Sequence, residues 1–252
     1  MPEFDSPFHL LRVTDDNGVR LLKFERNQQS SMRIDDPFET DISYVGYLHL
    51  PMAVVPEATR ALVIGLGGGS IAKFCNRFLP ASHMTVLEIN PYVLALRREF
   101  QVPDDDARFQ VIAADAALYL RTEAPQYEVL LVDGFDHEGQ PAALCTQRFY
   151  DDCLAALPTG GLLVVNLHYD HPDYPVLVER ISRSFNRHAV EVITQEKTNS
   201  IVFARKGLPI SPRCLNLRHS LAGLENAARS ELRAELARML WQMKSLDPKN
   251  GD

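Results

Sequence analysis

Several features are scarce in this chain of 252 residues, and each scarcity excludes a class of protein. The four cysteines form no C-x-x-C pair, so the sequence predicts no zinc site. Basic residues number 26 against 33 acidic ones, and the resulting formal charge of −7 argues against a nucleic-acid-binding protein. We therefore expect no bound metal and no nucleic-acid partner.

Long apolar segments are also missing. No run of about 18 apolar residues occurs, so we expect no segment that spans a membrane. The N-terminus, MPEFDSPFHLL, is acidic and lacks the basic start and apolar stretch of a signal peptide. Scattered cysteines fit a reducing compartment, where they act as small apolar residues. These features predict a cytoplasmic protein without a membrane partner.

The patterns that are present divide the chain into three predicted domains. Residues 1–56 predict a small β domain, because an Asn-Gly turn at Asn17 and Gly18 separates two apolar runs, although residues 42–52 carry apolar residues at helical spacing. Residues 57–207 alternate apolar strands with helical segments, which predicts a Rossmann-like catalytic domain. Residues 208–252 predict a C-terminal helical extension.

The central domain predicts a doubly wound α/β sheet. Near-continuous apolar runs suit strands covered on both faces, and they lie at 61–64, 84–87, 109–113, 129–132 and 162–166. The last two strands, at 189–194 and 200–205, are joined by a link too short for a crossover helix, so they must form an antiparallel hairpin. Such an ending is usual for S-adenosylmethionine-type transferases, whereas a dinucleotide fold more often stays parallel.

Glycines and acids follow successive strands. Gly65, Gly67 and Gly69 form a G-x-G-x-G loop before a helix N-terminus, where a ligand can approach the backbone closely. Ser70 occupies the last glycine position of the dinucleotide fingerprint, which disfavours a dehydrogenase. Glu88 ends the second strand, where an acid can accept both hydroxyls of a ribose.

The third and fourth strands also end in carboxylates. Asp115, followed by Ala116, either accepts the amine of an adenine or caps the next helix, and the sequence leaves both roles open. Asp133 and Asp136 lie three residues apart after the fourth strand, where they can orient a cationic amine and take its proton. The segment from His168 to His171 lacks helical spacing and predicts no metal site.

The order and spacing of five segments resemble the polyamine synthase family, which comprises spermidine synthases and their bacterial relatives. These segments are 27–32, 62–70, 86–91, 113–116 and 131–136. The resemblance implies transfer of an aminopropyl group from decarboxylated S-adenosylmethionine to an amine, putrescine in the family reaction, with release of methylthioadenosine. It also implies a homodimer.

The resemblance assigns roles to individual residues. Asp133 would be the catalytic acid/base, and Asp136 and Tyr44 would bind the amine. The cofactor would be contacted by Gln29, Gly65, Gly67, Gly69, Glu88, Asp115, Ala116 and Pro141.

Departures from the family pattern leave the acceptor amine open. Spermidine synthases carry an aspartate inside the glycine loop where this chain has Gly68, and Val45 and Gly46 replace polar residues after Tyr44. Losing partners for a buried ammonium costs on the order of 3–5 kcal/mol. The sequence thus retains the cofactor-binding motifs and loses part of the diamine-binding ones.

Two alternatives therefore remain. The first is a methyltransferase that uses intact S-adenosylmethionine, with Lys73 or Ser70 holding its carboxylate. Val63 counts against it, since methyltransferases of this fold usually carry an acid at that position. The second is a nucleoside-binding protein without polyamine synthase activity, and the retained Asp133 and Asp136 argue against it.

Overall fold

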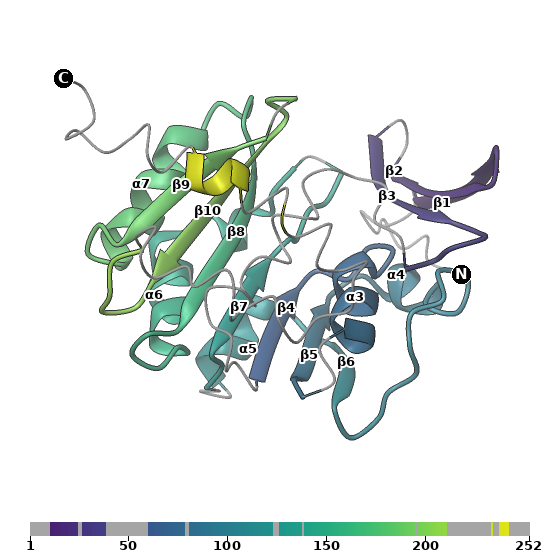
Figure 1. Ribbon diagram of the computed structural model, residues 1–252, viewed down its shortest axis with the longest axis horizontal. Helices are drawn as coiled ribbons and strands as arrows, with labels where there is room; N and C mark the ends of the chain where they lie inside the picture. The colour runs from purple at the N-terminus through teal and green to yellow at the C-terminus, as the bar shows by residue number, and fades with distance from the viewer. Residues whose placement is uncertain are drawn as a thin grey trace, which may run out of the picture.

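The computed structural model describes residues 11–24, 27–38, 60–78, 81–122, 126–137, 139–194, 196–210, 233 and 237–241. Figure 1 shows two separate sheets. One sheet has three strands and the other has seven. Tyr44, the predicted helix at 42–52 and most of the predicted C-terminal extension lie outside the described residues. The division into three domains therefore stays a prediction.

The small sheet is antiparallel, with strand order β1-β2-β3. Its strands are β1 (Leu11–Asp16), β2 (Val19–Phe24) and β3 (Asn27–Arg33). Asn17 and Gly18 have φ values of 48° and 80°, so the predicted two-residue turn is confirmed. Leu22 and Met32 are buried in the apolar core that also includes residues of the large sheet and of the helices on one of its faces, so the small sheet shares that core.

The large sheet has the strand order β6-β5-β4-β7-β8-β10-β9. The strands are β4 (Arg60–Ile64), β5 (His83–Glu88), β6 (Phe109–Ala113), β7 (Val129–Val132), β8 (Leu162–His168), β9 (Ala189–Ile193) and β10 (Asn199–Arg205). The strands from β4 to β8 pair in parallel, whereas β10 is antiparallel to both β8 and β9. The predicted parallel sheet with an antiparallel ending is confirmed.

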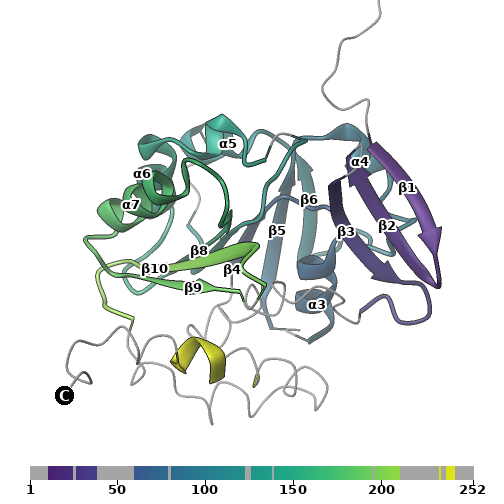
Figure 2. The ribbon, with the colours of Figure 1, turned by 90° about the horizontal axis from the view of Figure 1, so that it is seen from above.

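Helices cover both faces of this sheet, as Figure 2 shows. They are α3 (Ser70–Phe78), α4 (Pro91–Ala95), α5 (Ala116–Thr122), α6 (Gln147–Ala155) and α7 (Tyr174–Ser184). Phe74 of α3 and Val93 of α4 belong to one core, and Leu120, Phe149 and Ile181 belong to the other. Two apolar cores explain why the strands carry near-continuous apolar runs. No helix among the described residues is long and apolar enough to cross a membrane.

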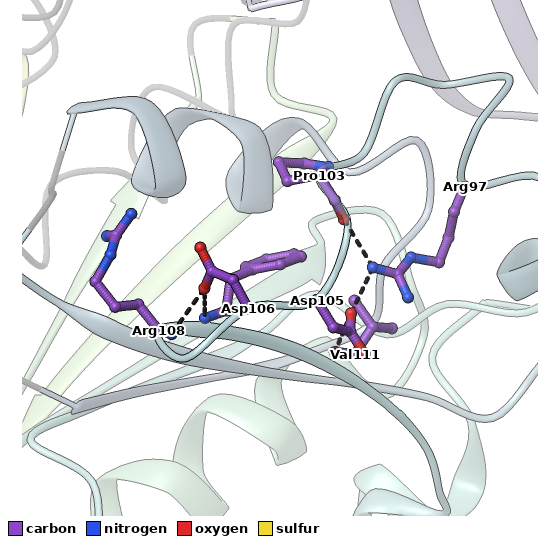
Figure 3. A network of polar contacts seen from close by, with 7 residues as sticks. Arg97, Pro103, Asp105, Asp106, Arg108 and Val111 are labelled. Carbon is purple, nitrogen blue, oxygen red and sulfur yellow. Dashed lines mark hydrogen bonds and ion pairs between the residues drawn. The ribbon is translucent and has the colours of Figure 1, made fainter.

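Helix α4 is short and ends at Ala95. The connection to β6 is built by side chains (Figure 3). Asp105 Oδ1 accepts hydrogen bonds from the Arg97 guanidinium at 2.6 Å and from Val111 N at 3.2 Å. Asp106 Oδ1 accepts from the backbone N–H groups of Arg108 and Phe109, which lowers the Asp106 pKa. The acidic run before β6 is exposed, and it also fixes where the strand begins.

Candidate active site

A cavity of about 750 Å³ lies where the connections leave the sheet in opposite directions. From β4 the chain proceeds outward through β5 and β6, and from β7 it proceeds the other way to β8. Such a switch point opens a crevice at the carboxyl ends of parallel strands. Nine predicted site residues line it, namely Gln29, Gly65, Gly67, Glu88, Asp115, Ala116, Asp133, Asp136 and Pro141.

The glycine loop is shaped by close backbone contacts. Gly65 has a φ of +97°, and a Cβ there would lie 2.3 Å from the carbonyl oxygen of Asp133. Gly69 does not line the cavity, and a Cβ there would lie 2.4 Å from Val102 Cγ2. We therefore assign Gly69 to packing behind the loop, whereas Gly65 and Gly67 face the cavity. Gly65 also sets the position of Asp133, because the two residues touch through their backbones.

Glu88 holds the loop from the end of β5. Its Oε2 accepts a hydrogen bond from Leu66 N at 2.9 Å, and its Oε1 accepts from Asn90 N at 2.8 Å. Burial raises the pKa of this carboxyl, while the backbone N–H groups around it lower the pKa in opposition. A carboxylate oxygen can accept two hydrogen bonds, and each Glu88 oxygen accepts one of the two bonds described above. Glu88 can therefore also accept hydrogen bonds from hydroxyl groups of a ligand in the cavity.

Asp115 performs the capping role that the sequence left open. Its Oδ1 accepts a hydrogen bond from Leu118 N at 3.0 Å, in the first turn of α5. The residue is exposed and lines the cavity, while the neighbouring Ala116 is buried. Capping and cavity lining coincide at this position, so the geometry is compatible with both roles.

Asp133 is a second cavity carboxyl whose pKa is raised by burial. It follows β7 directly, and burial raises its pKa to about 6. Asn166 opposes this effect, because its Nδ2 donates a hydrogen bond of 2.8 Å to Asp133 Oδ1. A carboxyl with a pKa near neutrality can both accept and return a proton under physiological conditions.

The loop after Asp133 closes on itself before it reaches η1 (Ala142–Leu144). Asp136 N donates to Gly139 O at 2.8 Å, and Asp136 Oδ1 accepts from Gly139 N at 3.0 Å. Pro141 precedes η1 with a φ of −56° and lines the cavity. Asp136 is thus presented from a compact turn three residues after Asp133, and both residues line the cavity.

Sequence reasoning missed several cavity residues. Asn166 and Asn199 come from β8 and β10, and the Phe135 and His168 rings stack with centroids 4.4 Å apart. Asn90 lines the cavity, and its buried Nδ2 has no hydrogen-bond partner among the described residues. One signal was available in the sequence, since Asn166 is the polar residue that ends the predicted apolar strand at 162–166, and the register places it beside Asp133.

Charge in the cavity is strongly one-sided. Five carboxylates line it, those of Glu88, Asp115, Asp133, Asp136 and Asp170, and its described lining contains no lysine or arginine. Lys73, a candidate anchor for a ligand carboxylate, is buried on α3 outside the cavity, where its Nζ donates to Phe100 O at 3.1 Å. Within the described ranges, no group of His, Cys, Asp and Glu side chains could hold a metal ion.

The parallel sheet that ends in the antiparallel strands β10 and β9 has the Rossmann-like topology that the sequence predicts for a transferase rather than for a dinucleotide-binding protein. Comparison with known proteins then gives the family. The chain belongs to the spermine/spermidine synthase family, because the model of the spermine/spermidine synthase domain matches residues 46–195, more than half of the chain. The predicted membership of the polyamine synthase family, a family of enzymes, is confirmed.

Individual relatives agree with this result. The polyamine aminopropyltransferase of Neisseria meningitidis serogroup A is 32% identical over 252 residues, covering 98% of this chain and 93% of that protein. A probable spermidine synthase from Corynebacterium glutamicum has a TM-score of 0.69 at 19% identity, over 84% of this chain and 82% of that one. A spermidine synthase in complex with the transition state analogue AdoDATO has a TM-score of 0.63 at 22% identity, over 89% and 88%.

Proposed function

We propose that this protein transfers an aminopropyl group from decarboxylated S-adenosylmethionine to an amine. The nucleoside lies against the tips of β4, β5 and β6, with Glu88 on its ribose and Asp115 and Ala116 at its adenine. The amine lies against the tips of β7 and β8, near Asp133 and Asp136. Gln29, Gly65, Gly67 and Pro141 complete the wall around the donor, and Tyr44 adds a contact to the amine.

The charge balance of the cavity carries this proposal. A decarboxylated donor and an amine acceptor are both cationic, and five carboxylates line the cavity without a lysine or arginine in its described part. Intact S-adenosylmethionine carries a carboxylate that needs a donor. Lys73 is directed at Phe100 O rather than at the cavity, so of the two predicted anchors only Ser70 lines it.

Asp133 supplies the acid/base chemistry. As the neutral amine nitrogen bonds to the propyl carbon, the carbon–sulfur bond breaks, its electron pair stays on sulfur, and methylthioadenosine leaves. The ionised Asp133 carboxylate stabilises the positive charge that develops on the nitrogen during the attack, and it then accepts the proton that this nitrogen loses. Its raised pKa of about 6 makes the carboxyl a stronger base than an exposed aspartate while leaving it mostly ionised at neutral pH.

The shape of the glycine loop supports the proposal that the acceptor is bound differently here than in spermidine synthases. A Cβ on Gly68 would lie 2.5 Å from Ser30 Oγ and 3.0 Å from Phe100 Cδ1, so the aspartate of the family pattern does not fit without movement. Groups on the β7 and β8 side must then bind the amine. We propose that the acceptor is an amine, and we leave its length open. We also propose that the protein is a homodimer, which light scattering can measure.

Calorimetry of the pure protein tests the donor. We expect binding of methylthioadenosine and decarboxylated S-adenosylmethionine, with weaker binding of the intact cofactor and none of NAD. Mass spectrometry after incubation with decarboxylated donor and a panel of mono-, di- and polyamines should then show an amine heavier by one aminopropyl group. Preference for the intact cofactor would support the methyltransferase alternative instead. Nucleoside binding without turnover on any amine would support a non-catalytic protein.

A further inference from the structure

A row of polar side chains crosses three neighbouring strands beside the cavity. Asn166 Nδ2 donates to Asp133 Oδ1 at 2.8 Å, and Asn199 Nδ2 donates to Asn166 Oδ1 at 3.0 Å. Thr198 Oγ1 donates to Asn199 Oδ1 at 3.0 Å. All four residues line the cavity, and Asn166 and Asn199 are 1% and 8% exposed. The row therefore leads from the solvent-accessible Thr198 to the half-buried carboxylate of Asp133.

The strands bring these residues together through alternation. Side chains two apart share a face of a strand, and Val164 and Ile201 lie in one apolar core. Asn166 and Asn199 continue the faces of Val164 and Ile201 toward the same edge of the sheet. In the antiparallel register Asn199 pairs with His168, so Asn199 and Asn166 are diagonal neighbours. Polar residues thus replace the apolar stripe only where it reaches the cavity.

The ionised Asp133 fixes the direction of each amide, because a carboxylate only accepts hydrogen bonds. Asn166 must therefore turn its nitrogen toward Asp133, which leaves its oxygen to accept from Asn199 Nδ2. The Asn199 oxygen then accepts from the Thr198 hydroxyl, which can act as donor or acceptor. Every donor in the row therefore points toward the carboxylate, and reversing one amide would set two donors or two acceptors against each other.

Asp133 depends on this row for its charge. The titratable groups that share the cavity are Glu88 after β5, Asp115 after β6, Asp136 and His137 on its own loop, and His168 and Asp170 at the end of β8. The described lining contains no lysine or arginine, and Asn166 is the side chain that lowers the pKa of Asp133 against its burial. The Asn166 amide stabilises the ionised form of Asp133, an effect that a neighbouring cation often has on a carboxylate.

We propose that Asn166, Asn199 and Thr198 form a positioning relay that orients Asp133 and keeps it ionised for catalysis. The relay occupies Oδ1 of Asp133 and leaves Oδ2 to accept the proton of the amine. None of the three acts on the substrate directly in this scheme. The inference rests on the proposed aminopropyl transfer for its kinetic consequences, and its electrostatic consequence can be measured without turnover.

The test is the pH profile of kcat/KM in Asn166→Leu, Asn199→Leu and Thr198→Val. Asn166→Leu should move the acidic limb upward by about one pH unit, so that kcat/KM falls about fivefold at pH 6 and changes little at pH 9. Asn199→Leu and Thr198→Val should shift the limb by successively smaller amounts, since each acts one hydrogen bond further away. Thr198→Ser keeps the hydroxyl that donates to Asn199, so it should keep the wild-type profile.

Thr194→Val is the matched control. Its hydroxyl accepts from Asn199 N and donates to Asn199 O, so it supports the same residue but not the relay. This variant should lose stability without moving the acidic limb. A uniform loss of kcat/KM at all pH values in the relay variants, or an equal shift in Thr194→Val, would show a merely structural role and overturn the proposal.

A ¹³C titration of the Asp133 carboxyl, assigned by its absence in Asp133→Asn, separates this inference from the proposed function. If no amine is a substrate but Asn166→Leu raises the Asp133 pKa, aminopropyl transfer is wrong and the relay stands. If transfer occurs but that pKa is unchanged in Asn166→Leu and Asn199→Leu, the relay is wrong and the function stands. Thr198→Val, exposed at the outer end of the relay, supplies the same reading if a buried variant fails to fold.

Discussion

The two sides of the cavity hold their carboxylates in different ways. At the tips of β4 to β6, Glu88 and Asp115 accept hydrogen bonds from backbone N–H groups of nearby segments. At the tips of β7, β8 and β10, Asp136 also accepts from a backbone N–H, that of Gly139, but Asp133 accepts from the side chain of Asn166, which in turn depends on Asn199. The first side is therefore set by how the loops fold, whereas Asp133 on the second side is set by which side chains meet across strands.

This difference suggests where the family can change its specificity. A backbone donor survives almost any substitution of the residue that carries it, so a site built on such donors keeps its ligand. A side-chain donor disappears with a single substitution. The donor side of this chain follows the family motifs, whereas the loop position Gly68 and the predicted amine contacts depart from them. Changes to each side should accordingly have separable effects.

Asp133→Asn should produce the largest effect and separate the two sides most clearly. The amide cannot take the amine proton, so kcat should fall on the order of 10²–10⁴-fold. Binding of methylthioadenosine should stay within about twofold of wild type, because the donor contacts are unchanged. Steady-state kinetics and calorimetry on the same preparation measure both. Turnover that survives this change would refute the catalytic assignment.

Gly65→Ala should disturb the point where the two sides touch. The new Cβ would lie 2.3 Å from the Asp133 carbonyl at a φ of +97°, so strain and overlap together should cost about 3 kcal/mol of unfolding free energy. Gly18→Ala is the control, since Gly18 has a φ of +80° and no atom within 4 Å of its Cβ position. That variant should lose only about 1 kcal/mol. Equal losses in urea denaturation would mean that the contact with Asp133 is unimportant.

Burial of Asp133 should also appear as a pH dependence of stability. Its pKa is about 6 in the folded protein against an ordinary value of 3.8, so the folded state binds a proton more tightly than the unfolded state. The stabilisation is complete below about pH 4 and is lost as the pH rises through 6. Relative to Asp133→Asn, wild type should lose on the order of 2–3 kcal/mol between pH 4 and pH 8. Parallel stability curves for the two proteins would contradict a buried, desolvated carboxyl.

Glu88→Gln tests the other side of the comparison. The new amide nitrogen would face the backbone N–H of Leu66 or Asn90, so the loop loses an acceptor. Affinity for methylthioadenosine should fall about tenfold to hundredfold, while kcat at saturating donor changes much less. Glu128→Gln is the matched control, because Glu128 Oε2 also accepts a backbone hydrogen bond, from Arg60 N at 2.8 Å, but lies outside the cavity. A similar loss in both variants would point to general destabilisation.

The same contrast explains what the sequence could predict. Local patterns sufficed for the hairpin at Asn17 and Gly18, for helix α3 and for the strand tips that carry Glu88 and Asp133. Asn166 and Asn199 were missed because each meets its partner across 33 residues of chain, and the pairing register of β10 is not written in any local motif. Gly69 matched a motif, yet its contact with Val102 depends on how the chain returns after α4.

Lys73→Met should have the smallest effect on the site, and it decides between donors. The ammonium lies outside the cavity and burial lowers its pKa to about 8. Because the folded pKa is depressed, the cost of charging Lys73 is complete below about pH 8 and fades as the pH rises toward 10.5. Lys73→Met should therefore raise the melting temperature more at pH 7 than at pH 10. Lys197→Met, which makes the same charge change on an exposed turn, should show no such difference.

In Lys73→Met, affinity for decarboxylated S-adenosylmethionine should change by less than about twofold, since a cationic donor needs no ammonium partner. A selective loss of affinity for intact S-adenosylmethionine would instead show that Lys73 holds a carboxylate, and would favour the methyltransferase.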